Sequence, residues 1–584
     1  MAAAAGACLN AASRPSPFSP MLDSTAPARE AAALGSAPPE PVVRHFRQIL
    51  LWPLRLMQPE DDTRDAGAPW VRLAAQPGSP WREAADVDGG EAGRFEERHY
   101  RELLSFLPYV QRFLYGEGGE ERGAPDAPMR VLRRDDVARL RVQPRPDAAP
   151  LELEVVQLGL HFFYDVDVIV LALEVTADAL PLGLAQELLY RLGRAYPSGW
   201  DAGGRPLHDL HRVEWLDAAG CVLAASDCER REAYLDFVGR HRAPRIAAHW
   251  AWLLEPMTAD RGAGAAGGCA LRYRQIETHR MPVMGYLALD DPLALTRGDF
   301  VRLGLVTGSE GPAPGGPALP YAAQHLADFE PRYCYDRFWA DAGPAPNTRY
   351  LCSGHALVVV GEAGSAFYAC GERGVLAQFR HQHFLLFLIA HFQKAALLMF
   401  SDGLVEALRR LRVDDAASVR EFKRAIRGSF EGFLRFTHRY WFHEVSEQTQ
   451  MRGLFQLCAG HLGIDPLYAE VRERIAEMNA YLDADSLRRQ ANTVVRLTVV
   501  TIFGLIGTVT TGFLGMNLLA LGDEPIARRL GYFSVTFVAT IALTVYTIVK
   551  SKRLSDWLDA LSDERLPGLA KLKVLVDVWR QPRH

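Results

Sequence analysis

Five residues near the end of the chain could line a path for a polar solute. Val494, Thr498, Thr501, Leu505 and Thr508 are separated by alternating steps of three and four, so in a helix they share one face. A single threonine in a membrane helix often bonds to a carbonyl of its own helix and packs as a small side chain. Three aligned hydroxyls favour a polar lumen instead. The apolar members of the stripe would then be constrictions that close by dewetting.

The tripeptide Gly515-Met516-Asn517 follows the same stretch and could select an ion. Magnesium binds oxygen and gives up its water reluctantly. Backbone carbonyls of Gly515 and Met516, together with the Asn517 amide, would accept hydrogen bonds from the water around a hydrated ion. These oxygens could therefore hold a hydrated cation at the end of the apolar run.

Two acidic residues, Asp523 and Glu524, come shortly afterwards. A ring of carboxylates at this point would raise the local cation concentration. Against this, Arg528 and Arg529 lie only a few residues on, and acidic loop residues are usually just solvated. The sequence leaves both interpretations open.

The elements that must position these residues are two apolar runs. Leu497 to Ala520 contains no charged residue and, at about 1.5 Å per residue, is long enough to cross a hydrocarbon layer of roughly 30 Å. A second run follows, Gly531 to Val549, after a short connection. We predict a membrane hairpin with a first helix at 494–520, an outer loop at 521–530 and a second helix at 531–549.

Basic residues set the orientation of this hairpin. They flank its two inner ends, whereas the connection carries only two. The positive-inside tendency places both termini and the large preceding region in the cytoplasm, including a basic tail at 550–584. This predicts a multi-pass protein of a bacterial-type inner membrane, with a mitochondrial inner membrane as the weaker alternative. The orienting residues are Arg488, Arg489, Arg496, Lys550, Lys552 and Arg553.

A Gly-Met-Asn signature at the end of the first of two C-terminal membrane helices resembles the CorA-type divalent cation transporters. The resemblance covers about Ala416 to Arg553. It implies a pentamer and a signature loop that acts as the selectivity element for Mg²⁺, with Asn517 as the residue that contacts the metal. The region before Phe379 fits the family's general plan of a cytosolic α/β domain. Family members often carry an acidic residue just after the signature, whereas Leu518 and Leu519 follow here. In the family, cytosolic magnesium bound by carboxylates between subunits holds the pore shut. Asp483 and Asp485 lie near the membrane end of the stalk but fit a solvated helix face better than such a site.

Composition limits the other classes of function. The 584 residues carry a net charge of −5, which gives no basic field for nucleic acid. Eight cysteines without a CxxC pair favour reduced thiols. Residues 1–40 are rich in Ala, Pro and Ser and predict a disordered extension without a secretory signal.

The spacing of apolar residues divides the region before the hairpin into helical and strand-like segments. Helical spacing is found at 42–57, 95–115 and 180–195, and strand-like patterns at 151–175, 212–225, 270–275 and 357–360. These predict an α+β or α/β domain at 41–378. From Phe379 only helical patterns remain, which predicts a helical stalk at 379–493. No helix breaker separates Glu470 from Leu497, so we expect the last stalk helix to continue into the membrane.

Several alternatives stay open. Phe384 to Phe400 is apolar, but His391, Gln393 and Lys394 interrupt it, which favours a buried helix over a third membrane span. His381, His383 and His391 could sense a metal, although core histidines are the simpler interpretation.

Signals for an enzyme or an organic cofactor are poor. Gly262, Gly264 and Gly267 satisfy GxGxxG without a flanking strand and helix, and His443-Glu444 lacks the second histidine of a zinc motif. The rival functions are a zinc, cobalt or nickel transporter of the same family, and a membrane-anchored sensor whose large soluble domain carries the activity.

Overall fold

The computed structural model describes residues 40–57, 68–84, 97–116, 128–260, 271–308, 319, 321–412 and 415–515, and some positions between 525 and 546. The chain divides into two compact units, Met1–Glu40 and Pro41–His584. Nearly all of the first unit, including the predicted extension, lies outside the described residues. The architecture below is that of the second unit.

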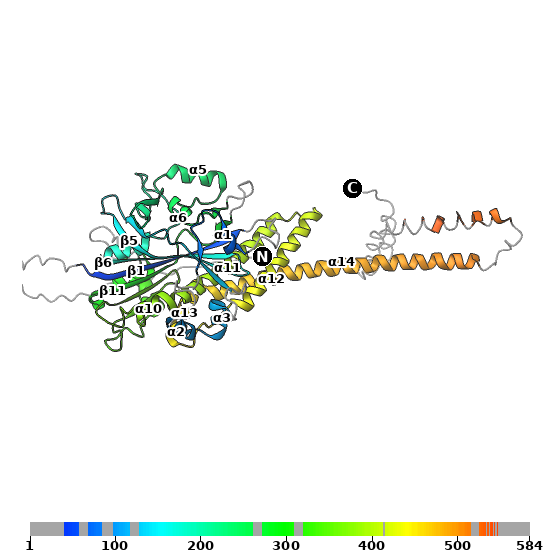
Figure 1. Cartoon of the computed structure of the whole chain (residues 1–584). Helices are drawn as coiled ribbons and strands as arrows, with labels where there is room; N and C mark the ends of the chain where they lie inside the picture. Colours follow the sequence, from blue (N-terminus) through cyan, green and yellow to red (C-terminus); the bar gives the residue numbers. More distant parts are fainter. Residues whose placement is uncertain are drawn as a thin grey trace, which may run out of the picture. The chain divides into compact units, whose positions relative to one another are not determined.

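A large mixed sheet forms the body of the described chain (Figure 1). Neighbouring strands run antiparallel, except that β11 pairs with β14, and β10 with β9, in parallel. The main path is, in order, β12 (Cys334–Tyr335), β13 (Arg349–Cys352), β14 (Ala356–Glu362), β11 (Val283–Leu289), β1 (Val42–Met57), β6 (Val168–Pro181), β5 (Leu151–Phe163), β4 (Arg139–Gln143), β7 (Arg212–Leu216) and β8 (Val222–Ala225). Off this path lie β2 (Arg82–Glu83), β3 (Met129–Arg133), β9 (Thr258–Ala259) and β10 (Arg272–Gln275).

The predicted helix at 42–57 is wrong, because this segment is the long central strand β1. It is buried on both faces, so its apolar residues form a nearly continuous run that periodicity cannot assign.

Pro53 is tolerated in the strand for a specific reason. Strand β11 pairs with β1 only as far as Leu50, and β10 begins to pair at Leu54. Pro53 falls between these two ladders, where no partner needs its missing N–H.

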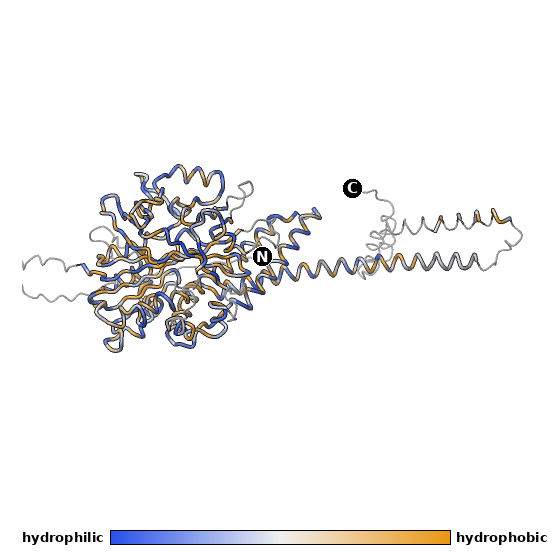
Figure 2. Tube along the Cα trace, in the orientation of Figure 1, coloured by the Kyte–Doolittle hydropathy of each residue, from blue (hydrophilic) through white to orange (hydrophobic). Residues whose placement is uncertain are grey.

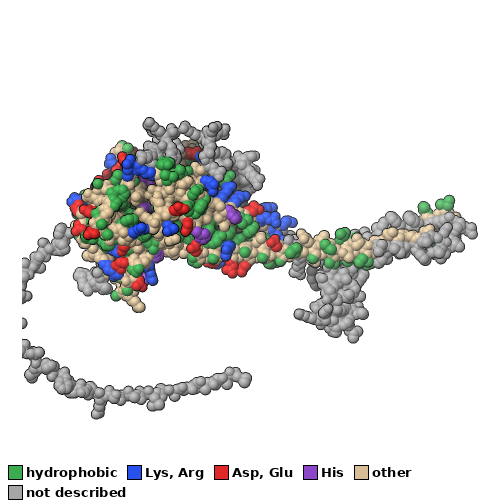
Figure 3. Space-filling view, turned by 90° about the horizontal axis from the view of Figure 1, so that it is seen from below, with side chains coloured by type: hydrophobic (Ala, Val, Ile, Leu, Met, Phe, Trp, Pro, Cys, Tyr) green, Lys and Arg blue, Asp and Glu red, His purple; other side chains and the backbone are tan. Residues whose placement is uncertain are grey.

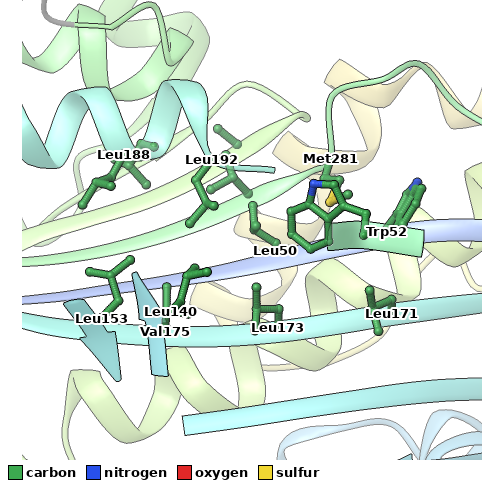
Figure 4. Close-up of a cluster of buried hydrophobic side chains, with 14 of the residues drawn as sticks. Leu50, Trp52, Leu140, Leu153, Leu171, Leu173, Val175, Leu188, Leu192 and Met281 are labelled. Atoms are coloured by element: carbon green, nitrogen blue, oxygen red, sulfur yellow. The ribbon is translucent and has the colours of Figure 1, made fainter. Parts of the chain in front are cut away.

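Helices cover both faces of the sheet, and the strands supply side chains alternately to two cores. Leu50, Trp52 and Leu54 of β1 belong to the core with α4 (Leu182–Arg191), α6 (Ala248–Leu253) and α7 (Arg297–Leu305). Ile49 and Leu51 belong to the core with α3 (Pro108–Tyr115) and α11 (Phe384–Arg410). Figure 4 shows the first core, in which Leu188, Leu192 and Met281 lie over Leu50 and Trp52, with β6 side chains below.

The other sequence predictions for this region agree with the structure. The strand pattern at 151–175 is the antiparallel pair β5 and β6, and the helical pattern at 95–115 is α2 (Glu97–Ser105) and α3, separated before Pro108. The remaining short helices are α1 (Pro69–Ala75), α5 (Arg231–His241), α8 (Ala323–Leu326), α9 (Phe329–Tyr333), α10 (Val375–Gln378), a 3₁₀ turn at Pro292–Ala294 and a π turn at Phe379–His383.

The apolar helix at 384–400 is a core helix, as the sequence favours. Within the described residues, Val375–Arg410 is the one helical stretch with the length and hydropathy of a membrane span, and 83% of its most apolar window is buried in the protein. Its side chains fill the core between the sheet and the C-terminal helices. Length and composition alone therefore do not make it a membrane segment.

The helical C-terminal region also follows the prediction. It consists of α12 (Ala416–Arg439), α13 (Thr449–Leu462) and α14 (Ile464–Gly515). Helix α14 runs for 52 residues without a break, because its sequence contains no proline after the first turn and no cluster of glycines before Gly504. In Figure 2 the blue of its charged residues gives way to orange and then to white toward the C-terminal end.

Candidate functional site

Helix α14 is anchored at its start and exposed along most of its length. It follows a left-handed Gly463 (φ 64°) that ends α13. Ile464, Val471 and Ile475 are buried in the core with α11, α12 and α13. Beyond Ile475, large apolar side chains such as Val494 and Leu497 are 62% and 63% exposed. Since isolated apolar surface of this kind is unfavourable in water, the second half of α14 needs an apolar environment.

The predicted stripe lies on the uncovered face of this helix. Val494, Thr498, Thr501 and Thr508 are all exposed, whereas the side chain of Leu505 lies outside the described ones. The structure thus places the three hydroxyls in one row along α14. In a single chain nothing described covers that row.

The opposite face of α14 is partly covered. Val499 is only 3% exposed, and Phe503, Gly507 and Thr511 are half-buried. These positions recur every four residues and, at about 100° per residue, the first three lie opposite the threonine stripe. The covered face was not predicted from the sequence.

One contact identifies what approaches this face. A Cβ at Gly507 would lie 2.9 Å from Cγ2 of Thr540, which belongs to the second apolar run, whereas Gly504 and Gly512 have nothing within 4 Å. A glycine at the point of closest approach is typical of packed membrane helices. The two apolar runs therefore meet at Gly507 and Thr540, on the side of α14 away from the stripe.

The threonine hydroxyls donate to their own helix. Thr498 bonds the carbonyl of Val494 at 2.9 Å, Thr501 that of Thr498 at 2.8 Å, and Thr508 that of Gly504 at 2.9 Å. This is the ordinary explanation considered for a single threonine. It does not remove the oxygen lone pairs, which remain free to accept. A row of hydroxyls whose protons are used and whose lone pairs are exposed suits a cation or the water bound to it.

Charge is confined to the first part of α14. Glu470 pairs with Arg474 on its first turns, and Asn479 lies 3.5 Å from an exposed Asp483, which fits the predicted solvated face. Arg496 is exposed, and no charged residue follows until the end of α14. Figure 3 shows charged side chains (blue and red) over the sheet body and the start of α14. Along the rest of the coloured part of α14 it shows hydrophobic side chains (green) and other atoms (tan).

Several predicted site residues cannot be placed. Gly515 is the last residue of α14 and is exposed. The positions that lie outside the described residues are Met516, Asn517, Asp523, Glu524, Lys550, Lys552 and Arg553, and of Arg488, Arg489 and Asp485 only the backbone is described.

The described residues add no support for a histidine metal site or for a dinucleotide site. His383 and His391 are buried, which lowers their pKa values to about 4 and about 3 and keeps both rings neutral. His391 Nε2 lies 3.0 Å from the carbonyl of Gly354. Within the described part of the chain, no group of three His, Cys, Asp or Glu side chains could hold a metal ion. The GxGxxG segment at 262–267 is outside that part.

No family model, curated protein or solved structure matches this chain.

Proposed function

We propose that this protein is an oligomeric membrane channel of the CorA type that passes Mg²⁺ or a related divalent cation. The observation that supports it most is the geometry of α14: one unbroken helix ends at Gly515, with its hydroxyl stripe exposed and its opposite face turned to the second apolar run. A helix that only anchors the protein has no need of an aligned polar face.

The pore forms between subunits. One chain supplies a single stripe, so several copies, five by the family resemblance, stand around an axis with the stripes inward. The second apolar run lies outside and faces the lipid. Both termini and the sheet domain lie in the cytoplasm, and the membrane is of the bacterial inner type.

The ion is the cargo, and it stays largely hydrated. Asn517 and the carbonyls of Gly515 and Met516 form the outer ring, and the hydroxyls of Thr508, Thr501 and Thr498 accept hydrogen bonds from the ion's water further in. Asp523 and Glu524 attract cations to the mouth. No ATP is consumed, since a divalent ion crossing the full field gains about 4.6 kcal/mol per 100 mV.

The test is Mg²⁺ uptake into liposomes that contain an internal magnesium dye. We expect Asn517→Ala to lower uptake by about tenfold or more, since one hydrogen bond to a charged ligand is worth about 1.5–3 kcal/mol. Thr508→Val should lower it as well, because it removes a hydroxyl from the stripe at nearly constant volume. Thr511→Val is the matched control, since this threonine is half-buried on the flank of the covered face.

The outcomes separate the rivals. Equal uptake by Asn517→Ala and the wild type contradicts the filter assignment, and equal loss in Thr508→Val and Thr511→Val contradicts the stripe. Preference for Zn²⁺, Co²⁺ or Ni²⁺ in competition identifies the transporter of another metal. If the wild type binds a ligand but carries no ion, the protein is the membrane-anchored sensor.

A further inference from the structure

Two arginines meet on the sheet domain, and the one carboxyl group that acts on them, Asp209, reaches Arg194 but not Arg280. Arg194 follows α4, Arg280 precedes β11, and the two form an isolated antiparallel bridge. Residues directly opposite in such a pair have Cβ atoms about 4.5–5.5 Å apart on the same face. Both guanidinium groups lie by the ring of Tyr190, at 4.9 Å and 5.6 Å from its centroid. Like charges in this arrangement repel.

Burial makes the repulsion costly. Arg194 is 6% exposed, and its Nε is buried with no hydrogen-bond partner. Its Nη1 lies 2.9 Å from His279 Nε2, and Arg280 donates Nη2 to the carbonyl of Val306 at 2.5 Å. Burial and the neighbouring Arg194 lower the pKa of Arg280 to about 10. Among the described residues neither arginine has a carboxylate within 4 Å.

Other buried arginines of this chain are neutralised. Arg134 pairs with Asp136 at 2.7 Å, and Arg349 pairs with Asp336 at 2.7 Å. Lys394, close by, has its own partner in Glu277 at 3.4 Å. The pair at 194 and 280 differs: Arg194 has only the more distant Asp209, and no carboxylate acts on Arg280.

The groups around the pair suit an anion with several oxygens. A guanidinium fork matches the geometry of phosphate and binds it through two N–H groups. Arg194 Nε is a buried donor that still lacks an acceptor, and an acceptor is what a phosphate oxygen provides. The Tyr190 hydroxyl, 2.8 Å from His208 Nδ1, is a further polar group at the same site.

We propose that Arg194 and Arg280 form a binding site for a phosphate-type oxyanion, carried by inorganic phosphate or by a phosphorylated nucleotide. The ligand supplies negative charge to Arg280, which no carboxylate of the described chain compensates, and holds the end of α4 to the start of β11. The site belongs to the sheet domain and needs none of the residues proposed to conduct ions.

The experiment measures binding to the full-length protein in detergent micelles by isothermal titration calorimetry and by the ligand-induced rise in Tm. The ligands are inorganic phosphate, AMP and ATP, with chloride at matched ionic strength as the reference. The variants are Arg194→Gln and Arg280→Gln. Arg240→Gln is the matched control, because Arg240 is exposed on α5 and pairs with Asp236.

We expect saturable binding by the wild type and an affinity about tenfold or more lower in each site variant, as expected for the loss of a charged hydrogen bond. Without ligand, Arg280→Gln should melt at the same temperature as the wild type or higher, because a like-charge contact has gone and no carboxylate partner of Arg280 is lost. A merely structural role predicts the reverse. Tighter binding of AMP or ATP than of phosphate identifies the nucleotide as the source, and equal binding identifies the phosphate group alone.

Three outcomes overturn the proposal: no binding of any of the three ligands, unchanged affinity in both site variants, or equal loss in Arg240→Gln. None of these readouts involves ion flux. The binding site and the proposed transport function are therefore tested independently of one another.

Discussion

At the scale of single residues, Asp209 is a buried carboxyl group that lacks a close counter-ion. It is 6% exposed, and its Oδ2 has no hydrogen-bond partner. Burial raises its pKa from 3.8 to about 7, although Arg194 and Arg191 act in the opposite direction. Glu174 shows the contrast, since Arg47 and Arg380 both bond to its carboxylate, at 2.5 Å and 2.8 Å.

The raised pKa of Asp209 predicts a pH-dependent stability. The unfolded chain loses this proton near pH 4 and the folded protein near pH 7, so the folded state binds more protons between these values. The free energy of unfolding therefore falls as pH rises from about 4 to 7. Asp209→Asn removes this loss, so the variant should melt several degrees above the wild type at pH 8 and close to it at pH 4, as measured by differential scanning fluorimetry.

Neighbouring groups do not share this titration. Burial lowers the pKa of His249 to about 3 and raises that of the Cys228 thiol, so both stay neutral through the window. Burial lowers the pKa of Arg194, but the Asp209 carboxyl raises it, and Arg194 stays charged through the window. The control is Asp236→Asn, an exposed carboxylate on α5. A stabilisation by Asp209→Asn that is the same at both pH values would contradict the argument.

Sequence reasoning could not find this cluster. Arg194 and Arg280 are separated by many residues and come together only because β11 returns beside the end of α4, and Asp209 acts on Arg194 from a third segment. No local spacing connects them, unlike the threonines of α14, which share a face through helix geometry alone. Contacts within one element are predictable from the sequence, and contacts between distant elements are not.

At the scale of elements, α14 and β1 show where pattern reasoning succeeds and fails. The continuity of α14 followed from the lack of breakers and an uncharged run, which are local properties of the chain. Strand β1 was misassigned because a segment buried on both faces has no polar side to reveal its period. The fold class of the sheet domain was predictable from its other strands, but the order of those strands was not.

The contact between Gly507 and Thr540 gives a prediction at this scale. Gly507→Ala would place a Cβ 2.9 Å from Thr540 Cγ2, closer than carbon atoms pack, and overpacking costs about 1–3 kcal/mol. We expect a lower Tm in detergent. Thr540→Ser deletes that same methyl group, so Gly507→Ala/Thr540→Ser should recover most of the loss.

Gly504→Ala is the control for helix propensity, because nothing lies within 4 Å of Gly504. It should be neutral or slightly stabilising, since alanine favours a helix over glycine by about 1 kcal/mol. If Gly507→Ala behaves like Gly504→Ala, or if the double variant does not recover, the two apolar runs do not pack at this point.

At the scale of the whole molecule, the exposed second half of α14 is the basis of the proposed assembly. Its stripe and its large apolar side chains are exposed in one chain, and a bilayer satisfies the apolar groups but not a row of hydroxyl lone pairs. Several stripes around a common axis satisfy both, because the hydroxyls then face water while the second apolar runs face lipid. The sheet domain has its own hydrophobic cores on both faces.

This arrangement predicts a defined oligomer whose flux depends on voltage. Native mass spectrometry from detergent should give five chains per particle, and liposomes with a valinomycin-clamped, inside-negative potential should take up Mg²⁺ faster than liposomes at zero potential. At about 100 mV the potential contributes about 4.6 kcal/mol per divalent ion, so an electrodiffusive pore responds strongly, whereas an electroneutral exchanger does not. A monomer, or uptake that is indifferent to potential, would leave α14 without a lumen, and its threonines would then be ordinary packing residues that bond only to their own helix.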